Sequence, residues 1–181
     1  MVRGNGFTPY KALIRAITYQ QLHGKAAATI FARFRDLYPS GRFPTPEEIL
    51  DTPIRKLRSA GLSQAKARGI LDVAEKTRLR IVPSSRVIRG LTDEEIIERL
   101  TQVRGVGVWT VQMLLMFQLG RLDVLPIDDY GVRNGFSLAY KRPMPKPKEL
   151  LEFGERWKPF RSVAAWYLWR AVDLERGTLE K

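Results

Sequence analysis

Helical periodicity runs along nearly the whole chain, and it limits the fold more than any other feature of the sequence. In the stretch "TPYKALIRAITYQQ" apolar side chains recur at steps of three and four residues, at Tyr10, Leu13, Ile14 and Ile17. The stretch "KAAATIFARFRDLY" continues the same pattern, which is typical of amphipathic helices. No stretch alternates polar and apolar residues over the length of a strand, apart from a few residues such as "RIVPS". The sequence therefore predicts an all-α protein.

Several of the expected helices begin at residues that cap helices well. Thr45 precedes a proline and two acids, Ser63 precedes "QAKARGILDVAEKTRL", and Thr92 precedes another acidic first turn. A hydroxyl oxygen at this position accepts a hydrogen bond from a free amide of the first turn. Three prolines between residues 143 and 147 predict a loop that leads to a final pair of helices.

The length and composition exclude several classes of protein. The 181 residues suffice for one sizeable core, or for two small lobes that share one, and we expect a single domain over residues 1–181. The absence of cysteine excludes disulfides, thiolate zinc sites and iron–sulfur clusters, and a single histidine argues against a histidine-built metal site. The stretch "MVRGNGFTPYK" lacks the apolar segment of a signal peptide, and no window approaches the roughly 20 apolar residues of a membrane span. We expect a cytoplasmic protein without a membrane partner.

The net charge points to a polyanionic partner. The 31 Lys and Arg against 19 Asp and Glu give a formal net charge of +12. Basic groups close to phosphates release condensed counterions and so raise the affinity for nucleic acid. The alternative is a soluble basic protein without such a partner, because no Lys/Arg tail concentrates the charge.

The stretch "LTQVRGVGVWTVQMLLMFQLG" is typical of a helical hairpin, over about residues 100–120. One helix ends, a tight turn follows at Gly105 and Gly107, and a second helix runs to Gly120. Amides at the start of the second helix point outward at the positive end of its dipole, where a phosphate fits. On the turn alone, a plain helix connector is the favoured interpretation.

Two adjacent acids, Asp128 and Asp129, stand between an apolar run and a helix in "DVLPIDDYGVRNGF". Aspartate caps helices well, and the residues by themselves favour that role over catalysis.

The hairpin together with this acidic pair resembles the helix-hairpin-helix DNA glycosylases, in which a catalytic aspartate follows the hairpin by about twenty residues. Here Trp109 and Asp129 are 20 residues apart. The segments "AITYQQLHGKAAATIFARF", "FPTPEEIL", "GLSQAKARGILDVA", "GVGVWTVQMLLMFQLGRLDVLPIDDYGVRNGF" and "WKPFRSVAAWYLWRA" are similar to segments of the 3-methyladenine DNA glycosylase II family, in the same order. The resemblance covers about residues 7–173. It implies an all-α, two-lobed helix-hairpin-helix glycosylase domain without an iron–sulfur cluster.

The resemblance implies that Asp129, in a loop over about residues 123–131, is the catalytic acid. A 3-methyl- or 7-methylpurine is already cationic and leaves without a general acid, so one carboxylate suffices to stabilise the cationic sugar and to orient water. Family relatives that also cleave the strand carry a lysine at the position of Trp109. A monofunctional enzyme without lyase activity is therefore expected.

The resemblance also assigns a substrate pocket to Trp109, Tyr130, Trp169 and Met113. Aromatic rings attract a cationic base. Met113 stands where some relatives have an aromatic residue, and a methionine tolerates bases of varied shape but stacks on them more weakly.

Two segments are expected to contact DNA. By resemblance Leu22 fills the gap left by a flipped base, with Gln21 and His23 in the minor groove. The alternative is that Leu22 belongs to the core and His23 to the surface. The hairpin residues Arg104, Gly105, Val106 and Gly107 would bind the phosphate backbone.

The backbone carbonyls of Thr101, Val103 and Val106 match positions that in the family hold a monovalent cation, Na or K, that bridges to phosphate. Such an ion would be structural, and no other cofactor is expected.

These expectations combine into a monomeric DNA glycosylase of base excision repair, associated with the nucleoid, that releases alkylated purines of the 3-methyladenine and 7-methylguanine type from double-stranded DNA. The first alternative is a glycosylase for neutral damaged bases such as hypoxanthine. The second is a non-catalytic DNA damage or structure sensor, and the third is a basic helical scaffold that binds DNA without lesion preference.

Overall fold

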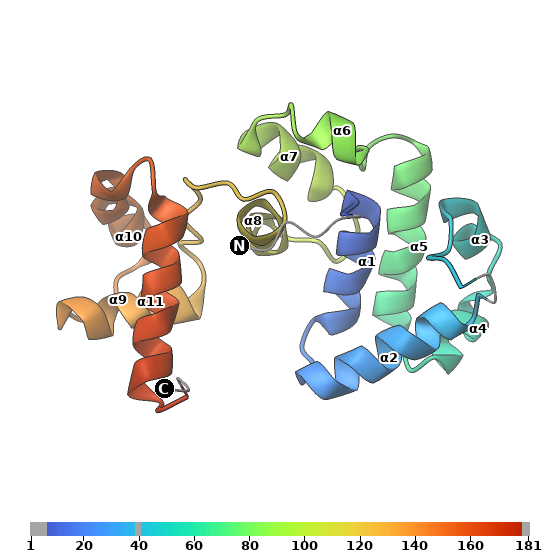
Figure 1. Cartoon of the computed structure of the whole chain (residues 1–181), viewed down its shortest axis with the longest axis horizontal. Helices are drawn as coiled ribbons and strands as arrows, with labels where there is room; N and C mark the ends of the chain where they lie inside the picture. Colours follow the sequence, from blue (N-terminus) through green and yellow to red (C-terminus); the bar gives the residue numbers. More distant parts are fainter. Residues whose placement is uncertain (1–6, 39–40, 179–181) are drawn as a thin grey trace. The chain divides into compact units, whose positions relative to one another are not determined.

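The structure is a computed structural model that describes residues 7–38 and 41–178 (Figure 1). In these two ranges every regular element is a helix, so the all-α prediction is confirmed, and the stretch "RIVPS" forms no strand. The chain divides into two compact units, one ending at Val111 and the other beginning at Gln112. No helix within the described ranges is long and apolar enough to cross a membrane.

The first unit is built around the pair of helices α1 and α5, which lie side by side, with α2 against α1 and the short α3 and α4 against α5 (Figure 1). Its helices are α1 (Pro9–Tyr19), α2 (Gly24–Asp36), α3 (Pro46–Leu50), α4 (Ile54–Ser59), α5 (Gln64–Arg78), α6 (Ser85–Ile88) and α7 (Asp93–Leu100). The fully buried side chains follow the helical spacing of the sequence and include Leu13, Ile14, Ile17, Phe34, Leu57, Ile70, Ile88, Ile96 and Leu100.

The predicted helix starts are confirmed by their hydrogen bonds. Thr45 accepts from the backbone N–H of Glu48 and Thr92 from that of Glu95, and each glutamate carboxylate in turn accepts the N–H of its cap residue. Ser63 caps α5 through its hydroxyl in the same way, but no glutamate in the described ranges accepts its backbone N–H. These caps satisfy amides that the first helical turn leaves without partners.

The helix α8 (Val108–Phe117) carries the chain from the first unit into the second. It ends three residues before Gly120, where the sequence had placed its end. The N–H of Leu119 bonds the carbonyl of Leu114 at 3.1 Å and the N–H of Arg121 bonds that of Leu115 at 2.9 Å, while Gly120 has a φ of +69°. Bonds of this kind around a left-handed glycine close a helix, so Gly120 marks the turn after the helix.

The second unit is held together by the packing of α9 (Tyr130–Tyr140) against α11 (Arg161–Glu175), with α10 (Pro147–Gly154) and the 3₁₀ turn η1 (Glu155–Trp157) between them in the chain (Figure 1). Gly135 allows the close approach: a Cβ atom there would lie 1.9 Å from the carbonyl oxygen of Leu168. Beside it, the rings of Phe136, Tyr140 and Phe153 contact one another with centroids 4.7 to 4.9 Å apart.

Candidate active site and DNA-binding turns

Asp129 occupies the N-cap position of α9, and one of its carboxylate oxygens receives two hydrogen bonds. The backbone N–H of Val132 donates to Oδ1 at 2.8 Å, and the indole Nε1–H of Trp169 donates to the same oxygen at 2.9 Å. The capping role that the residues suggested is therefore real, and the indole adds an orienting contact that capping does not require. Asp129 is half-buried, whereas its neighbour Asp128 is exposed.

The indole of Trp169 lies between Asp129 and the ring of Phe117. The two rings have centroids 5.9 Å apart and planes inclined by 30°. On the other side Gly131 leaves the space that the indole needs: a Cβ atom there would lie 2.9 Å from Cδ1 of Trp169 and 3.1 Å from Oδ1 of Asp129. The sequence analysis did not identify Phe117 or Gly131, because only the fold brings α8, α9 and α11 to one point.

The loop that leads to Asp129 is fastened to the start of α11. Arg161 donates from Nε to Oδ1 of Asp123 at 2.7 Å and from Nη2 to Oδ2 at 3.0 Å. This bond from the guanidinium lowers the pKa of the Asp123 carboxyl. Ser162 is buried, donates to the carbonyl of Arg121 at 2.8 Å and accepts from the N–H of Val124 at 2.9 Å. The sequence analysis missed this clamp, whose halves lie 38 or more residues apart.

The other expected pocket residues differ in position and exposure. Tyr130 follows Asp129 directly and is 62% exposed, and Met113 on α8 is half-buried. Trp109 lies in the first turn of α8, within the first unit, and is 47% exposed. Of the predicted pocket set, the structure brings Trp169 into direct contact with Asp129 in the second unit.

The residues expected to enter the DNA form a tight turn between α1 and α2. Gln21 has a φ of +54°, and the N–H of Leu22 bonds the carbonyl of Tyr19 at 3.3 Å. All three residues of the turn, Gln21, Leu22 and His23, are exposed. Leu22 is 39% exposed, so the alternative that places it in the core is wrong.

The hairpin turn between α7 and α8 is anchored to the rest of the first unit. The N–H of Arg104 donates to Oδ2 of Asp72 on α5 at 2.7 Å. Gly105 has a φ of +82°, which side chains other than glycine rarely tolerate, and its carbonyl accepts from Nε2 of Gln20 at 2.8 Å. The side chain of Arg104 and the backbone of Gly105 are exposed, as a phosphate contact requires.

The remaining hairpin residues present backbone groups. The Val106 side chain is buried, with 4% exposure, so only its backbone can face a partner, while Gly107 is exposed. Of the three carbonyls considered for a cation, that of Val103 accepts the N–H of Val106 at 3.0 Å and keeps its second lone pair. Thr101 uses its hydroxyl to bond the carbonyl of Ile97 at 2.7 Å. Within the ranges that the structure describes, no group of His, Cys, Asp or Glu is arranged for a metal ion.

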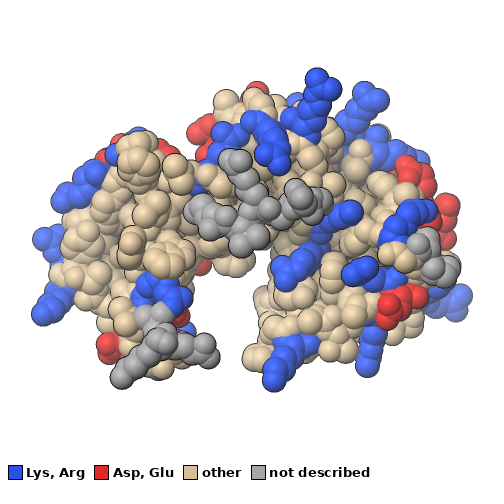
Figure 2. Space-filling view, in the orientation of Figure 1, with Lys and Arg blue, Asp and Glu red and all other residues tan. Residues whose placement is uncertain are grey.

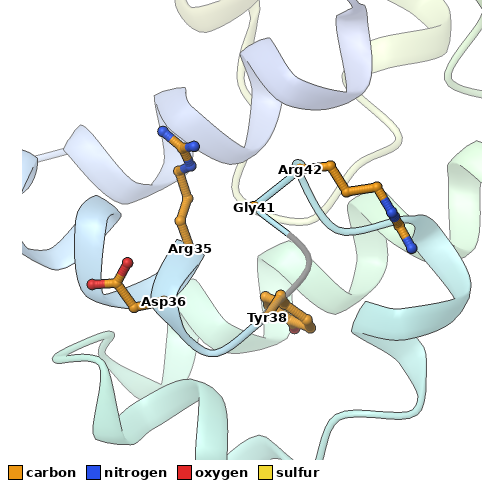
Figure 3. A pocket seen from close by; sticks show the side chains of 5 residues that line it. All are labelled: Arg35, Asp36, Tyr38, Gly41 and Arg42. Carbon is orange, nitrogen blue, oxygen red and sulfur yellow. The ribbon is translucent and has the colours of Figure 1, made fainter.

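Two further features lie on the surface of the first unit. A hollow in the first unit is lined by Arg35, Asp36, Tyr38, Gly41 and Arg42, and Figure 3 shows its charged side chains pointing in different directions rather than toward one point. On the face drawn in Figure 2, Lys and Arg side chains spread over the helices of the first unit and cover more of it than Asp and Glu do. On this face the positive charge is spread over several helices.

The model of the HhH-GPD superfamily base excision DNA repair proteins matches residues 14–159. The chain belongs to the HhH-GPD superfamily. It is 46% identical over 167 residues to DNA-3-methyladenine glycosylase 1 of Schizosaccharomyces pombe, which covers 92% of this chain and 73% of that protein. The family and the helix-hairpin-helix fold that the sequence motifs predicted are thereby confirmed.

Two solved structures have the same fold as this chain. The S. pombe 3-methyladenine DNA glycosylase in complex with abasic DNA has a TM-score of 0.83 and 42% identity, over 100% of this chain and 88% of that one. The DNA-3-methyladenine glycosidase of Bacillus halodurans has a TM-score of 0.86 and 32% identity, over 98% of this chain and 81% of that one.

Proposed function

We propose that this HhH-GPD protein is a monofunctional DNA glycosylase of base excision repair that hydrolyses the N-glycosidic bond of alkylated purines in duplex DNA. The observation that carries the proposal is the Asp129 carboxylate, whose Oδ1 is held by the Val132 amide and by the Trp169 indole. The names of the relatives at 46% and 42% identity support the same activity.

The chemistry follows from the leaving group. A purine methylated at N3 or N7 carries a positive charge, and breaking its glycosidic bond leaves a neutral base and an oxocarbenium-like sugar. One carboxylate beside the sugar stabilises the new charge and takes a proton from the attacking water. Asp129 is oriented for such a role, because two donors on Oδ1 fix the plane of its carboxylate. Trp109 offers no amine for a Schiff base, so the product is an intact abasic strand.

DNA binding is assigned to the two exposed turns of the first unit. The hairpin turn would bind phosphates through the side chain of Arg104 and the amides of Gly105 and Gly107, since the N–H of Arg104 itself donates to Asp72. In the other turn, Leu22 would fill the space of the flipped base. The backbone carbonyls of Thr101, Val103 and Val106 would hold a Na or K ion, since neutral carbonyl oxygens suit such cations. We propose that the protein acts as a monomer, because binding one lesion calls for one copy of each turn.

The proposal is tested by base release under single-turnover conditions. Three duplexes of one sequence would carry 7-methylguanine, hypoxanthine or guanine at a single position, and a methylated duplex would supply 3-methyladenine. We expect release of both methylpurines, at least about tenfold slower release of hypoxanthine, and strand cleavage only after hot alkali.

Other outcomes separate the alternatives. Comparable release of hypoxanthine would assign the protein to neutral damaged bases. Tight, lesion-selective binding without any release would assign it as a damage sensor. Binding without lesion preference would leave only the basic scaffold.

A further inference from the structure

Lys66 on α5 directs its charge into the protein. Its ammonium donates to the carbonyl of Thr18 at 2.9 Å and to the carbonyl of Gln20 at 2.7 Å, at the end of α1. Burial lowers the pKa of this ammonium. A lysine in a DNA-binding protein would ordinarily face the phosphates. Here the ammonium instead neutralises the last carbonyls of α1, which form the negative end of the helix dipole.

These carbonyls open the turn that carries Leu22. Gln20 ends α1 and the next residue, Gln21, adopts a φ of +54°, which costs free energy for a residue with a side chain. The turn closes with the bond from the N–H of Leu22 to Tyr19. Its conformation therefore depends on contacts that hold it from outside, and the ammonium of Lys66 supplies two of them.

The same helix α5 also holds the hairpin turn. Asp72 accepts the N–H of Arg104 at 2.7 Å and is itself paired with Lys76 at 2.7 Å. At Gly69 a Cβ atom would lie 3.0 Å from the carbonyl oxygen of Arg104, so α5 and the hairpin backbone are in close contact. The two turns are also joined directly, since Gln20 donates to the carbonyl of Gly105 at 2.8 Å.

We propose that Lys66 is a positioning residue that fixes the Leu22 turn at a set place relative to the phosphate-binding hairpin, with Gln20 as the direct link between the two turns. When the hairpin binds the DNA phosphates, Leu22 would then already lie at the height of the base stack, in the one turn conformation that Lys66 and Gln20 hold. The inference rests on the proposed function, because that function assigns to Leu22 the gap that the flipped base leaves in the stack.

The proposal separates Lys66 from a phosphate contact. A side chain that neutralises a phosphate contributes about one unit to the slope of log affinity against log salt. Since the ammonium of Lys66 is engaged by two carbonyls, its removal should leave this slope unchanged while it impairs insertion. Arg68, an exposed cation two residues along α5, is the matched control.

The experiment measures insertion directly, by the fluorescence of a 2-aminopurine placed beside a tetrahydrofuran abasic site in a duplex, at saturating protein. The variants are Lys66→Met, Lys66→Arg, Gln20→Ala, Leu22→Ala, the Lys66→Met/Leu22→Ala double variant and Arg68→Met. Lys66→Arg keeps donors for the two carbonyls. Gln20→Ala removes the hydrogen bond between the two turns, and because Gln20 is only half-buried this variant should fold. It serves as the second test if Lys66→Met does not fold.

We expect the fluorescence increase to fall at least about threefold in Lys66→Met and in Gln20→Ala, and to be largely restored in Lys66→Arg. The double variant should be no worse than Leu22→Ala alone, because residues that act through one another are not additive. Arg68→Met should respond like the intact chain at saturation, and the salt slope of Lys66→Met should stay within about half a unit of the intact chain.

Additive losses in the double variant, an unchanged fluorescence response, or a salt slope reduced by about one unit in Lys66→Met would overturn the proposal. The fluorescence signal needs no turnover. An intact chain that shows the expected pattern but releases no methylpurine would therefore refute the proposed function and leave the role of Lys66 standing.

Discussion

Replacing Trp169 with phenylalanine removes one hydrogen bond from Asp129 and keeps an aromatic ring in its place. The indole N–H lies 2.9 Å from Oδ1, and the ring packs against Phe117 with centroids 5.9 Å apart. A phenyl ring can keep that packing but donates nothing. Oδ1 then loses one of these two donors and keeps the bond from Val132, so the orientation of the carboxylate is less restricted.

The expected magnitude follows from the bond that is lost. A hydrogen bond to a charged group contributes about 1.5–3 kcal/mol, and water can replace part of it because Asp129 is only half-buried. At the lower end of that range, the single-turnover rate of methylpurine release should fall about tenfold in Trp169→Phe. The affinity for a duplex with an abasic-site analogue should change less than about threefold, because the indole bond orients the acid rather than the DNA.

The assay is single-turnover release of 7-methylguanine from a duplex, with binding and thermal unfolding followed on the same samples. Trp166→Phe is the matched control, since this exposed tryptophan stands on the same helix and contacts Tyr167 and Arg170 instead of Asp129. A rate within about twofold of the intact chain in Trp169→Phe, or an equal loss in Trp166→Phe, would refute the orienting role.

Two further perturbations test the surroundings of the acid. Gly131→Ala should slow base release about tenfold with little loss of folding stability, because the new methyl group displaces the Trp169 side chain rather than backbone. Gly90→Ala is the control: the nearest atom to its new methyl group lies 3.7 Å away, so it should change neither the rate nor the stability. Parallel measurements of base release and thermal unfolding would detect the difference. Asp123→Asn should remove part of the pH dependence of the folding stability. Arg161 lowers the pKa of the Asp123 carboxyl in the folded state. The ion pair therefore stabilises the fold above the ordinary aspartate pKa of about 3.9, and this stabilisation is lost as the pH falls through the lower folded-state pKa. Urea unfolding from pH 7 down to pH 3 should therefore show a shallower acid-side decline for Asp123→Asn, and parallel curves would contradict the importance of the ion pair.

The helices and their caps could be predicted from the sequence because their causes are local. Thr45, Ser63 and Thr92 each bond an amide three residues away, and the buried positions of α1 follow its own periodicity. The pattern predicts the end of α8 at Gly120, three residues too late, because a glycine in the turn after a helix gives the same sequence signal as a glycine at the helix end.

The site could be predicted only in part. The residues alone suggested that Asp129 caps a helix, and the resemblance of five ordered segments was needed to suggest chemistry. The indole bond from Trp169, the clamp between Asp123 and Arg161, and the contacts of Lys66 join residues 38 to 48 positions apart. No periodicity or cap pattern reports such contacts, since they arise from the packing of whole helices.

The catalytic role of Asp129 is tested most directly by methylpurine release by Asp129→Asn beside the intact chain, at matched salt and with DNA binding followed in parallel. Asparagine caps helices as well as aspartate does and keeps an oxygen for Val132 and Trp169, so the fold and the turns that bind DNA should survive. Because the negative charge that stabilises the sugar cation is lost, release should fall by a factor of about 10² to 10⁴ while binding is retained or tightened. Release by Asp129→Asn within about threefold of the intact chain would contradict the central role of this carboxylate.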